Sequence, residues 1–226
     1  MARAGEEIYN PVQQDRIVWR KTARETDGRL LSVDLFVSPL GGNPLHVHPN
    51  QEEHFKAVSG IFGVQVGDEH RWLGVGEEAI IPPGTPHRWW NDSDDEEAHV
   101  SVELRPALNS EFFFETLYGL ARDGKTDRNG VPNLLQQAVT LNGINRGEIY
   151  LASPPVPVQK MVLAALAPVG KLLGYKDHYR KYSAADDSGG AGPPSTTSVI
   201  TRAVALVASL VISSFLVGRA RRLGKS

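Results

Sequence analysis

The segment HVHPNQEEHF, residues 46–55, places His46 and His48 shortly before the paired glutamates Glu52 and Glu53. Imidazole and carboxylate groups are the ligands that a divalent first-row metal accepts where thiols are absent, and this chain contains no cysteine. Because side chains alternate along a strand, His46 and His48 share one face and can point at one ion. The segment therefore predicts a metal site, although a His-x-His pair alone is more often two ordinary strand histidines.

A second segment with candidate chemistry is GEEAIIPPGTPHRWWN, residues 76–91, which supplies His87 after a turn rich in proline and glycine. Together the two segments resemble the paired signatures of the cupin superfamily. The first signature is matched by Gly41, His46, His48, Glu53 and Gly60, and the second by Gly76, Pro82, Gly84, His87 and Asn91. Only the leading glycine departs from the family spacing, because Gly41 stands one residue closer to His46 than the pattern requires.

This resemblance implies a small antiparallel jelly-roll β-barrel in which His46, His48, Glu53 and His87 converge on one divalent metal ion. Fe, Mn, Ni and Zn are all candidates, because each of them accepts nitrogen and oxygen ligands. Three imidazoles and one carboxylate would leave two open positions on an octahedral ion, where a small molecule could bind. Glu53 could also act as a catalytic base.

The remaining pattern predicts a mainly β domain followed by helices. From about residue 16 to residue 104, short β-type runs alternate with turns, which predicts a barrel over residues 1–108. Helical spacing then predicts an extension over residues 109–182, with helices at 109–124, after Pro132 and within 156–182, the last kinked or broken at Pro168. Residues 183–197 are rich in small residues and predict a flexible linker.

The C-terminal segment is the candidate for membrane contact. Residues 203–218 carry no charged side chain, and we expect a single transmembrane helix over residues 198–218, followed by a basic tail over 219–226. A buried helix of the folded domain is the alternative. Because the N-terminal residues contain no apolar run, the barrel is expected in the cytoplasm, anchored to a membrane. The basic tail favours the same side, so the topology of a single span stays open.

Alternation along the strands predicts which side chains surround the ligands. Phe55 and Ala57 share the face of Glu53, Trp89 shares the face of His87, and these three with Val64 are expected to line an apolar substrate pocket. The alternative is that Phe55 and Trp89 simply fill the barrel. Glu52 and His54 are expected to point away from the site, and His70, His99 and His178 are interpreted as surface residues.

The function that this pattern favours is metal-dependent conversion of a small organic molecule. Dioxygenase-type oxidation is preferred over isomerase or lyase chemistry, and the competing class is a non-catalytic module that binds or senses a small molecule at a membrane. A formal net charge of −2 gives no basic field, so nucleic acid is not expected as a partner. Members of the superfamily are frequently dimers, which makes a homodimer one expected assembly.

Overall fold

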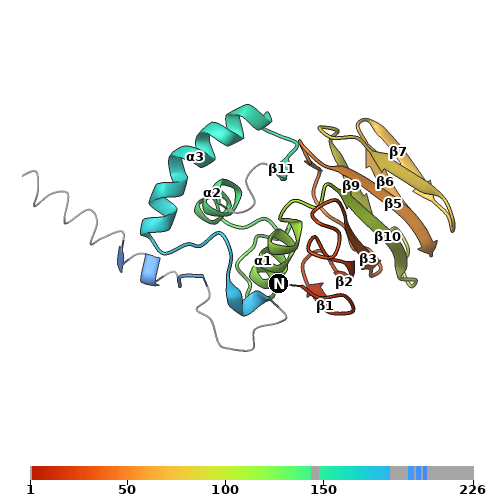
Figure 1. The fold of residues 1–226 in the computed structure, drawn as a ribbon, viewed down its shortest axis with the longest axis horizontal. Helices are drawn as coiled ribbons and strands as arrows, with labels where there is room; N and C mark the ends of the chain where they lie inside the picture. The colour runs from red at the N-terminus through yellow and green to blue at the C-terminus, as the bar shows by residue number, and fades with distance from the viewer. Residues whose placement is uncertain (1, 144–147, 184–192, 196, 200, 203–226) are drawn as a thin grey trace, which may run out of the picture.

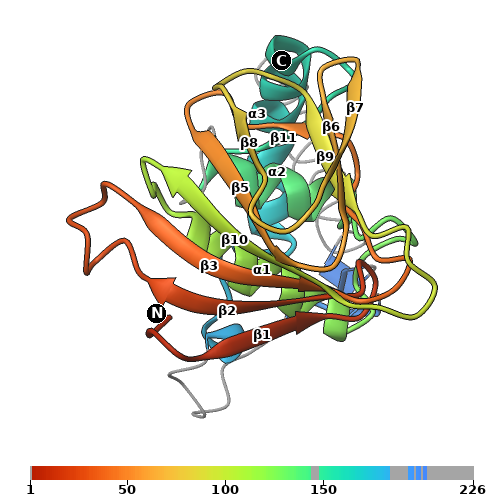
Figure 2. The same ribbon diagram turned by 90° about the vertical axis from the view of Figure 1, so that its right-hand side faces the viewer.

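The computed structural model describes residues 2–143, 148–183, 193–195, 197–199 and 201–202. Within these ranges the chain forms two antiparallel sheets, with the helices gathered at one end of them (Figure 1, Figure 2). The first sheet has the order β1-β2-β3-β10-β5-β8, and the second has the order β11-β4-β9-β6-β7. The architecture is therefore mainly β with added helices, as the sequence predicts.

The element bounds follow the turns that the sequence marks. The first sheet contains β1 Glu7–Asn10, β2 Asp15–Lys21, β3 Leu31–Val37, β10 Ala98–Arg105, β5 Glu52–Ser59 and β8 Glu78–Ile81. The second contains β11 Tyr150–Leu151, β4 His46–Val47, β9 His87–Trp90, β6 Phe62–Val66 and β7 Glu69–Leu73. The helices are α1 Ser110–Arg122, α2 Leu134–Asn142 and α3 Val156–Leu172, followed by the short 3₁₀ helix η1 Arg180–Tyr182. Strand β1 was not predicted from the sequence.

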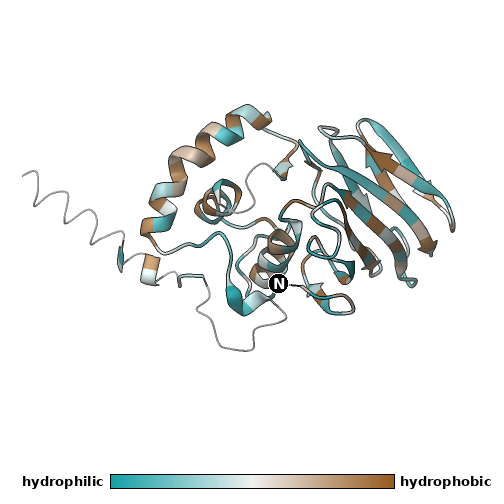
Figure 3. Ribbon diagram, viewed as in Figure 1, coloured by the Kyte–Doolittle hydropathy of each residue, from teal (hydrophilic) through white to brown (hydrophobic). Residues whose placement is uncertain are grey.

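The core lies between the two sheets, and strand alternation determines which side chains enter it. On β10, Ala98, Val100, Val102 and Leu104 are each at most 5% exposed, while the residues between them are only partly buried. Figure 3 shows the same alternation of apolar and polar residues along the strands. Burying a Val or Leu side chain stabilises a fold by about 1.5–3 kcal/mol. The period-two pattern is therefore sufficient to define the inner face of β10.

The helices begin and end largely where capping residues predict. The side chain of Asn133 accepts hydrogen bonds from the backbone nitrogens of the second and third residues of α2, as an N-cap should. The predicted break at Pro168 is not found, because α3 continues through this residue. Pro168 and Ala164 both face solvent, so water can hydrogen-bond the carbonyl of Ala164 that a proline cannot bond.

The helical extension is joined to the barrel by a strand as well as by packing. Strand β11 pairs with β4, and Val47 of β4 belongs to an apolar cluster with Ala138 of α2, Tyr150 of β11 and Leu163 of α3. Helix α1 lies against the first sheet beside β1 (Figure 1). The helices thus close one end of the barrel.

The predicted membrane helix falls almost entirely outside the described ranges. Of residues 198–218, the structure describes only 198, 199, 201 and 202. Across the described part of the chain, none of the helices is both long and apolar enough to cross a bilayer.

A buried acid joins helix α1 to the first sheet. Asp15 of β2 is 0% exposed and accepts a hydrogen bond from the hydroxyl of Tyr118 on α1, while its Oδ1 has no partner among the described residues. Burial raises the pKa of Asp15 from 3.8 to about 7, although the hydrogen bond from Tyr118 opposes this rise. The neutral carboxyl is therefore the form that the fold favours.

This burial predicts a pH-dependent stability. Between the unfolded pKa of 3.8 and the folded pKa of about 7, the unfolded state binds fewer protons than the folded state, so the free energy of unfolding falls as pH rises. In the wild-type chain, ionisation of Asp15 should lower the free energy of unfolding by on the order of 2–4 kcal/mol between pH 5 and pH 8, and Asp15→Asn should abolish this decrease. Urea unfolding at several pH values measures the difference. The exposed Asp94→Asn variant is the control. Parallel pH profiles for the wild-type chain and Asp15→Asn would contradict the expectation.

Candidate metal centre

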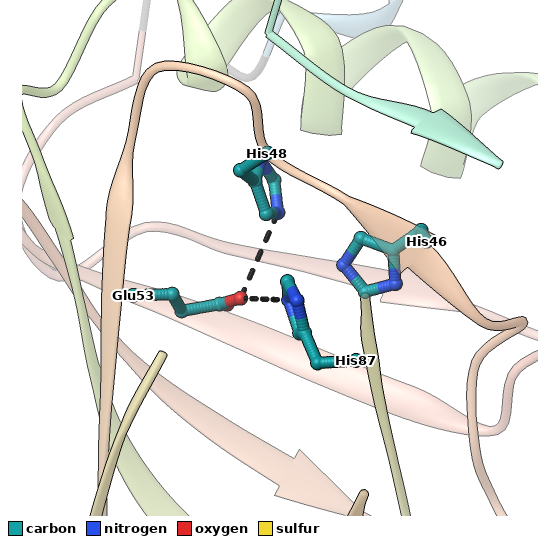
Figure 4. A group of neighbouring side chains, drawn as sticks. All are labelled: His46, His48, Glu53 and His87. Atoms are coloured by element: carbon teal, nitrogen blue, oxygen red, sulfur yellow. Dashed lines mark hydrogen bonds and ion pairs between the residues drawn. The ribbon is translucent and has the colours of Figure 1, made fainter. Parts of the chain in front are cut away.

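Four side chains from the two sheets meet inside the barrel (Figure 4). His46 lies on β4, His48 one residue beyond its end, Glu53 on β5, and His87 at the start of β9. Antiparallel pairing of β4 with β9 places His46 directly opposite His87. All four side chains are buried, and one donor atom from each lies within 4.8 Å of the others. The structure therefore brings together the four residues that the sequence selects.

The three imidazole rings are oriented by the same kind of hydrogen bond. Nδ1 of His46 and Nδ1 of His87 each lie 2.9 Å from a backbone carbonyl oxygen two residues earlier in the chain. Nδ1 of His48 lies 2.9 Å from the carbonyl oxygen of Glu148. A carbonyl oxygen only accepts, so each Nδ1 carries a proton and Nε2 is the atom that each ring offers to a metal.

The charges of the cluster are strongly coupled. Burial, together with the neighbouring imidazoles, lowers the pKa of His46 well below its usual value, and burial also lowers the pKa of His48. Burial alone would lower the pKa of His87 as well, but Glu53 Oε2 accepts a hydrogen bond from His87 Nε2 at 2.7 Å and the net shift is upward. Burial would raise the pKa of Glu53, but the bond from His87 brings it below the usual value.

This electrostatic pattern fits a divalent cation. His46 and His48 are neutral nitrogen donors, Glu53 is ionised, and Glu53 Oε2 also lies 3.6 Å from His48 Nε2. A cation held by this set would displace the proton shared by His87 and Glu53, as metals generally displace protons from their ligands. The buried group can therefore hold a metal ion, with one carboxylate charge offsetting part of the charge of the ion.

One residue of the extension supports this site from outside the barrel. The carbonyl of Glu148 accepts the hydrogen bond from His48, and the Glu148 side-chain Oε1 accepts one from the backbone nitrogen of Asn109 at 2.6 Å. Asn109 immediately precedes α1. Three residues after Glu148, Leu151 of β11 pairs with His46 of β4. Glu148 thus links the start of helix α1 to a candidate ligand.

A cavity of about 130 Å³ lies beside His46, His48 and Glu53. Its barrel wall includes Ile17, Leu35 and Trp89, and its opposite wall is formed by α1, α2, residues 130–132 and residues 149–151. The cavity therefore lies between the candidate metal centre and the helical extension.

Only part of the predicted pocket lies on this cavity. Trp89 lines it, whereas Phe55, Ala57 and Val64 are at most 1% exposed and belong to the barrel core. All three were expected to line the pocket, Phe55 and Ala57 because they share the face of Glu53 on one strand. The structure instead places them deeper between the sheets, where Phe55 packs against Phe62 with ring centroids 5.3 Å apart.

The sequence analysis did not predict that helix α1 forms a wall of the cavity. Phe113, Phe114 and Leu117 of α1 line the cavity and are only half-buried in the fold. The signal was present in the apolar spacing of NSEFFFETLYGL, residues 109–120, but that spacing alone does not identify what the apolar face covers.

The other acidic and histidine residues lie away from the cluster. His54 Nε2 lies 3.0 Å from a carboxylate oxygen of Glu78 on the outer face, and Glu52 is likewise partly exposed. His70 is exposed, as predicted. His178 differs from its prediction as a surface residue, because it is half-buried and its Nε2 lies 3.1 Å from Ser183 Oγ.

Comparison with known protein families agrees with the geometry of the site. The family model described as a cupin domain matches residues 36–103, a range that contains all four buried metal-binding candidates. The chain therefore carries a domain of the cupin superfamily. Its cupin domain carries both signature segments, and the pairing of β4 with β9 brings them into contact.

The individual proteins that match this cupin share limited sequence identity with it. It is 29% identical to a protein named "Probable oxidoreductase virH" from Hypocrea virens, over 79% of this chain and 87% of that one. It is 30% identical to oxidoreductase AOL_s00215g277 from Arthrobotrys oligospora, over 62% of this chain and 59% of the relative's length. Among solved structures, TT1209 from Thermus thermophilus is similar, with 28% identity, a TM-score of 0.39, and coverage of 46% of this chain and 90% of that chain.

The geometry of the site predicts which substitutions weaken metal binding. Replacing His46, His48, Glu53 or His87 by Ala should each weaken Zn²⁺ binding more than the ~10- to 100-fold that is typical when an outer partner of a ligand is lost. Glu52→Ala should leave the affinity unchanged, because this side chain points away from the cluster. Titration with a competing chelator measures the difference. Loss of metal in Glu52→Ala together with its retention in Glu53→Ala would show that the carboxylate is wrongly assigned.

Proposed function

We propose that this cupin is a metal-dependent oxidoreductase that acts on a small organic molecule, and that its reaction is a dioxygenase-type oxidation. The observation that carries the proposal is the buried cluster of His46, His48, Glu53 and His87 beside a cavity. The oxidoreductase names of two fungal relatives give independent support. Dioxygenation needs no further reductant, because the organic substrate supplies the electrons that reduce dioxygen and both oxygen atoms enter the product.

Each residue of the candidate metal centre has a defined part in this proposal. His46, His48 and His87 hold the ion through Nε2, and their Nδ1 hydrogen bonds fix the direction of each ring. A bound iron, manganese or nickel ion would supply the redox chemistry, and a zinc ion would supply Lewis-acid chemistry only. Glu53 would hold the ion through its carboxylate, and it is also the candidate catalytic base. Trp89 and α1 exclude water from the bound molecule.

Oxygen consumption tests this function. We expect the Fe²⁺-loaded chain to take up dioxygen in proportion to the organic compound consumed, and both atoms of isotope-labelled dioxygen to enter the product. Glu53→Gln retains an oxygen ligand without its charge and should reduce the rate, whereas Glu52→Gln should not.

The alternatives give different results in the same assay. Conversion of the compound without dioxygen would indicate isomerase or lyase chemistry. A compound that binds but is not converted with Fe²⁺, Mn²⁺ or Ni²⁺ would indicate a non-catalytic binding or sensing module.

We also propose that residues 198–218 anchor this cytoplasmic cupin domain to a membrane, on the grounds that residues 203–218 carry no charge. The 226-residue chain should remain in the membrane fraction after an alkaline carbonate wash, and a chain ending at residue 183 should be released with its metal. Recovery of the longer chain entirely in the soluble fraction would disprove the anchor.

A further inference from the structure

The cavity beside the metal centre has an unusual distribution of charge. Among the described residues that line it, Glu53 is the only carboxylate, and there is no lysine or arginine. Glu53 lies at the metal end. The rest of the wall is apolar or uncharged, with amides such as Gln137 of α2 and Gln159 of α3. A cation to pair with an anionic group therefore exists only where the metal would bind.

The polar groups of the wall are already partly occupied within the fold. Gln137 Nε2 donates to the carbonyl of Pro132 at 2.7 Å, and Gln159 Nε2 donates to the carbonyl of Leu151 at 2.7 Å. At the far side, the hydroxyl of Tyr118 donates to the buried Asp15. An anionic group brought to these walls would lose its hydration and gain no opposite charge, which is strongly unfavourable.

The volume of the cavity suits a small ligand. Its volume is about 130 Å³, close to an engineered apolar cavity of about 150 Å³ that binds benzene. Aromatic side chains form two sides, with Trp89 on the barrel and Phe113 and Phe114 on α1. Aromatic rings pack favourably against such side chains in offset or edge-on arrangements.

We infer that the substrate is a neutral compound with a single ring, whose metal-binding oxygen lies at one end and whose remaining surface carries no charge. This inference rests on the proposed function in one respect, since it takes the cavity as the substrate site. It deepens that function by excluding molecules with an anionic group remote from the metal, such as sugar phosphates and dicarboxylates.

Calorimetric binding of three matched probes tests the inference without turnover. The probes are 4-methylphenol, the neutral 4-hydroxybenzamide and the anionic 4-hydroxybenzoate, measured at neutral pH on the 226-residue chain. With Zn²⁺ bound, 4-methylphenol should bind. The charge comparison uses the metal-free chain, because a metal could itself capture the carboxylate. There, 4-hydroxybenzoate should bind at least tenfold more weakly than both neutral probes.

Two variants of Gln137 test the effect of adding a charge to the cavity wall. Gln137→Lys and Gln137→Met replace the amide that donates to Pro132 by unbranched side chains, of which one is charged and the other is neutral. Because opposite charges attract strongly away from bulk water, Gln137→Lys should bind 4-hydroxybenzoate at least tenfold more tightly than Gln137→Met. The two variants should bind 4-methylphenol about equally.

The outcomes separate this inference from the proposed oxidation. The inference would be overturned if 4-hydroxybenzoate bound the metal-free chain as tightly as 4-methylphenol, or if 4-hydroxybenzamide bound as weakly as 4-hydroxybenzoate. It would also be overturned if Gln137→Lys bound 4-hydroxybenzoate no more tightly than Gln137→Met. A metal-loaded chain that binds none of the probes would likewise overturn it. Binding of the neutral probes in the expected order without any oxygen uptake would support the inference and count against the oxidation alone.

Discussion

Burial of three imidazoles and a carboxylate within 4.8 Å of one another is the constraint around which this molecule is organised. Such a cluster is costly unless each ring has a hydrogen-bond partner and the charges balance. The chain meets the first requirement with backbone carbonyls, which fix Nδ1 of every histidine of the cluster. It meets the second by pairing His87 with Glu53, where a proton and a metal ion compete for the same place. The curvature of two sheets then brings β4, β5 and β9 close enough together for the ligands to converge.

The helical extension turns this cluster into a site that can select a ligand. Without α1 and α2, the ions and small molecules near the ligands would face the open end of the barrel. Phe113, Phe114 and Leu117 instead cover this end with an apolar wall. In the proposed function, the barrel holds the reactive ion and the helices select the ligand, a division that resembles the general separation of scaffold and recognition elements in proteins.

Much of this arrangement could be predicted from the sequence, and the failures have physical causes. The ligands His46, His48, Glu53 and His87 could be selected because spacing and alternation are local properties of the chain. The depth of Phe55 and Ala57 in the core could not be predicted, because alternation gives the face of the strand on which a side chain lies, whereas its depth depends on how the sheets pack. Helix α3 continues unbroken through Pro168 because the carbonyl of Ala164, which the proline cannot bond, faces water. The part played by Glu148 depends on a contact across 100 residues, which no local pattern encodes.

That long-range contact has a consequence for how the molecule assembles. Closing a loop of 100 residues between His48 and Glu148 costs chain entropy before any contact offsets it, and such distant pairings slow folding. The candidate ligand His48 therefore acquires its final orientation only after synthesis has passed β11 and the extension has docked. Because a metal binds the oriented ligands most tightly, its binding free energy would also stabilise the docked extension. Barrel and extension would then unfold together in the presence of metal and less cooperatively in its absence.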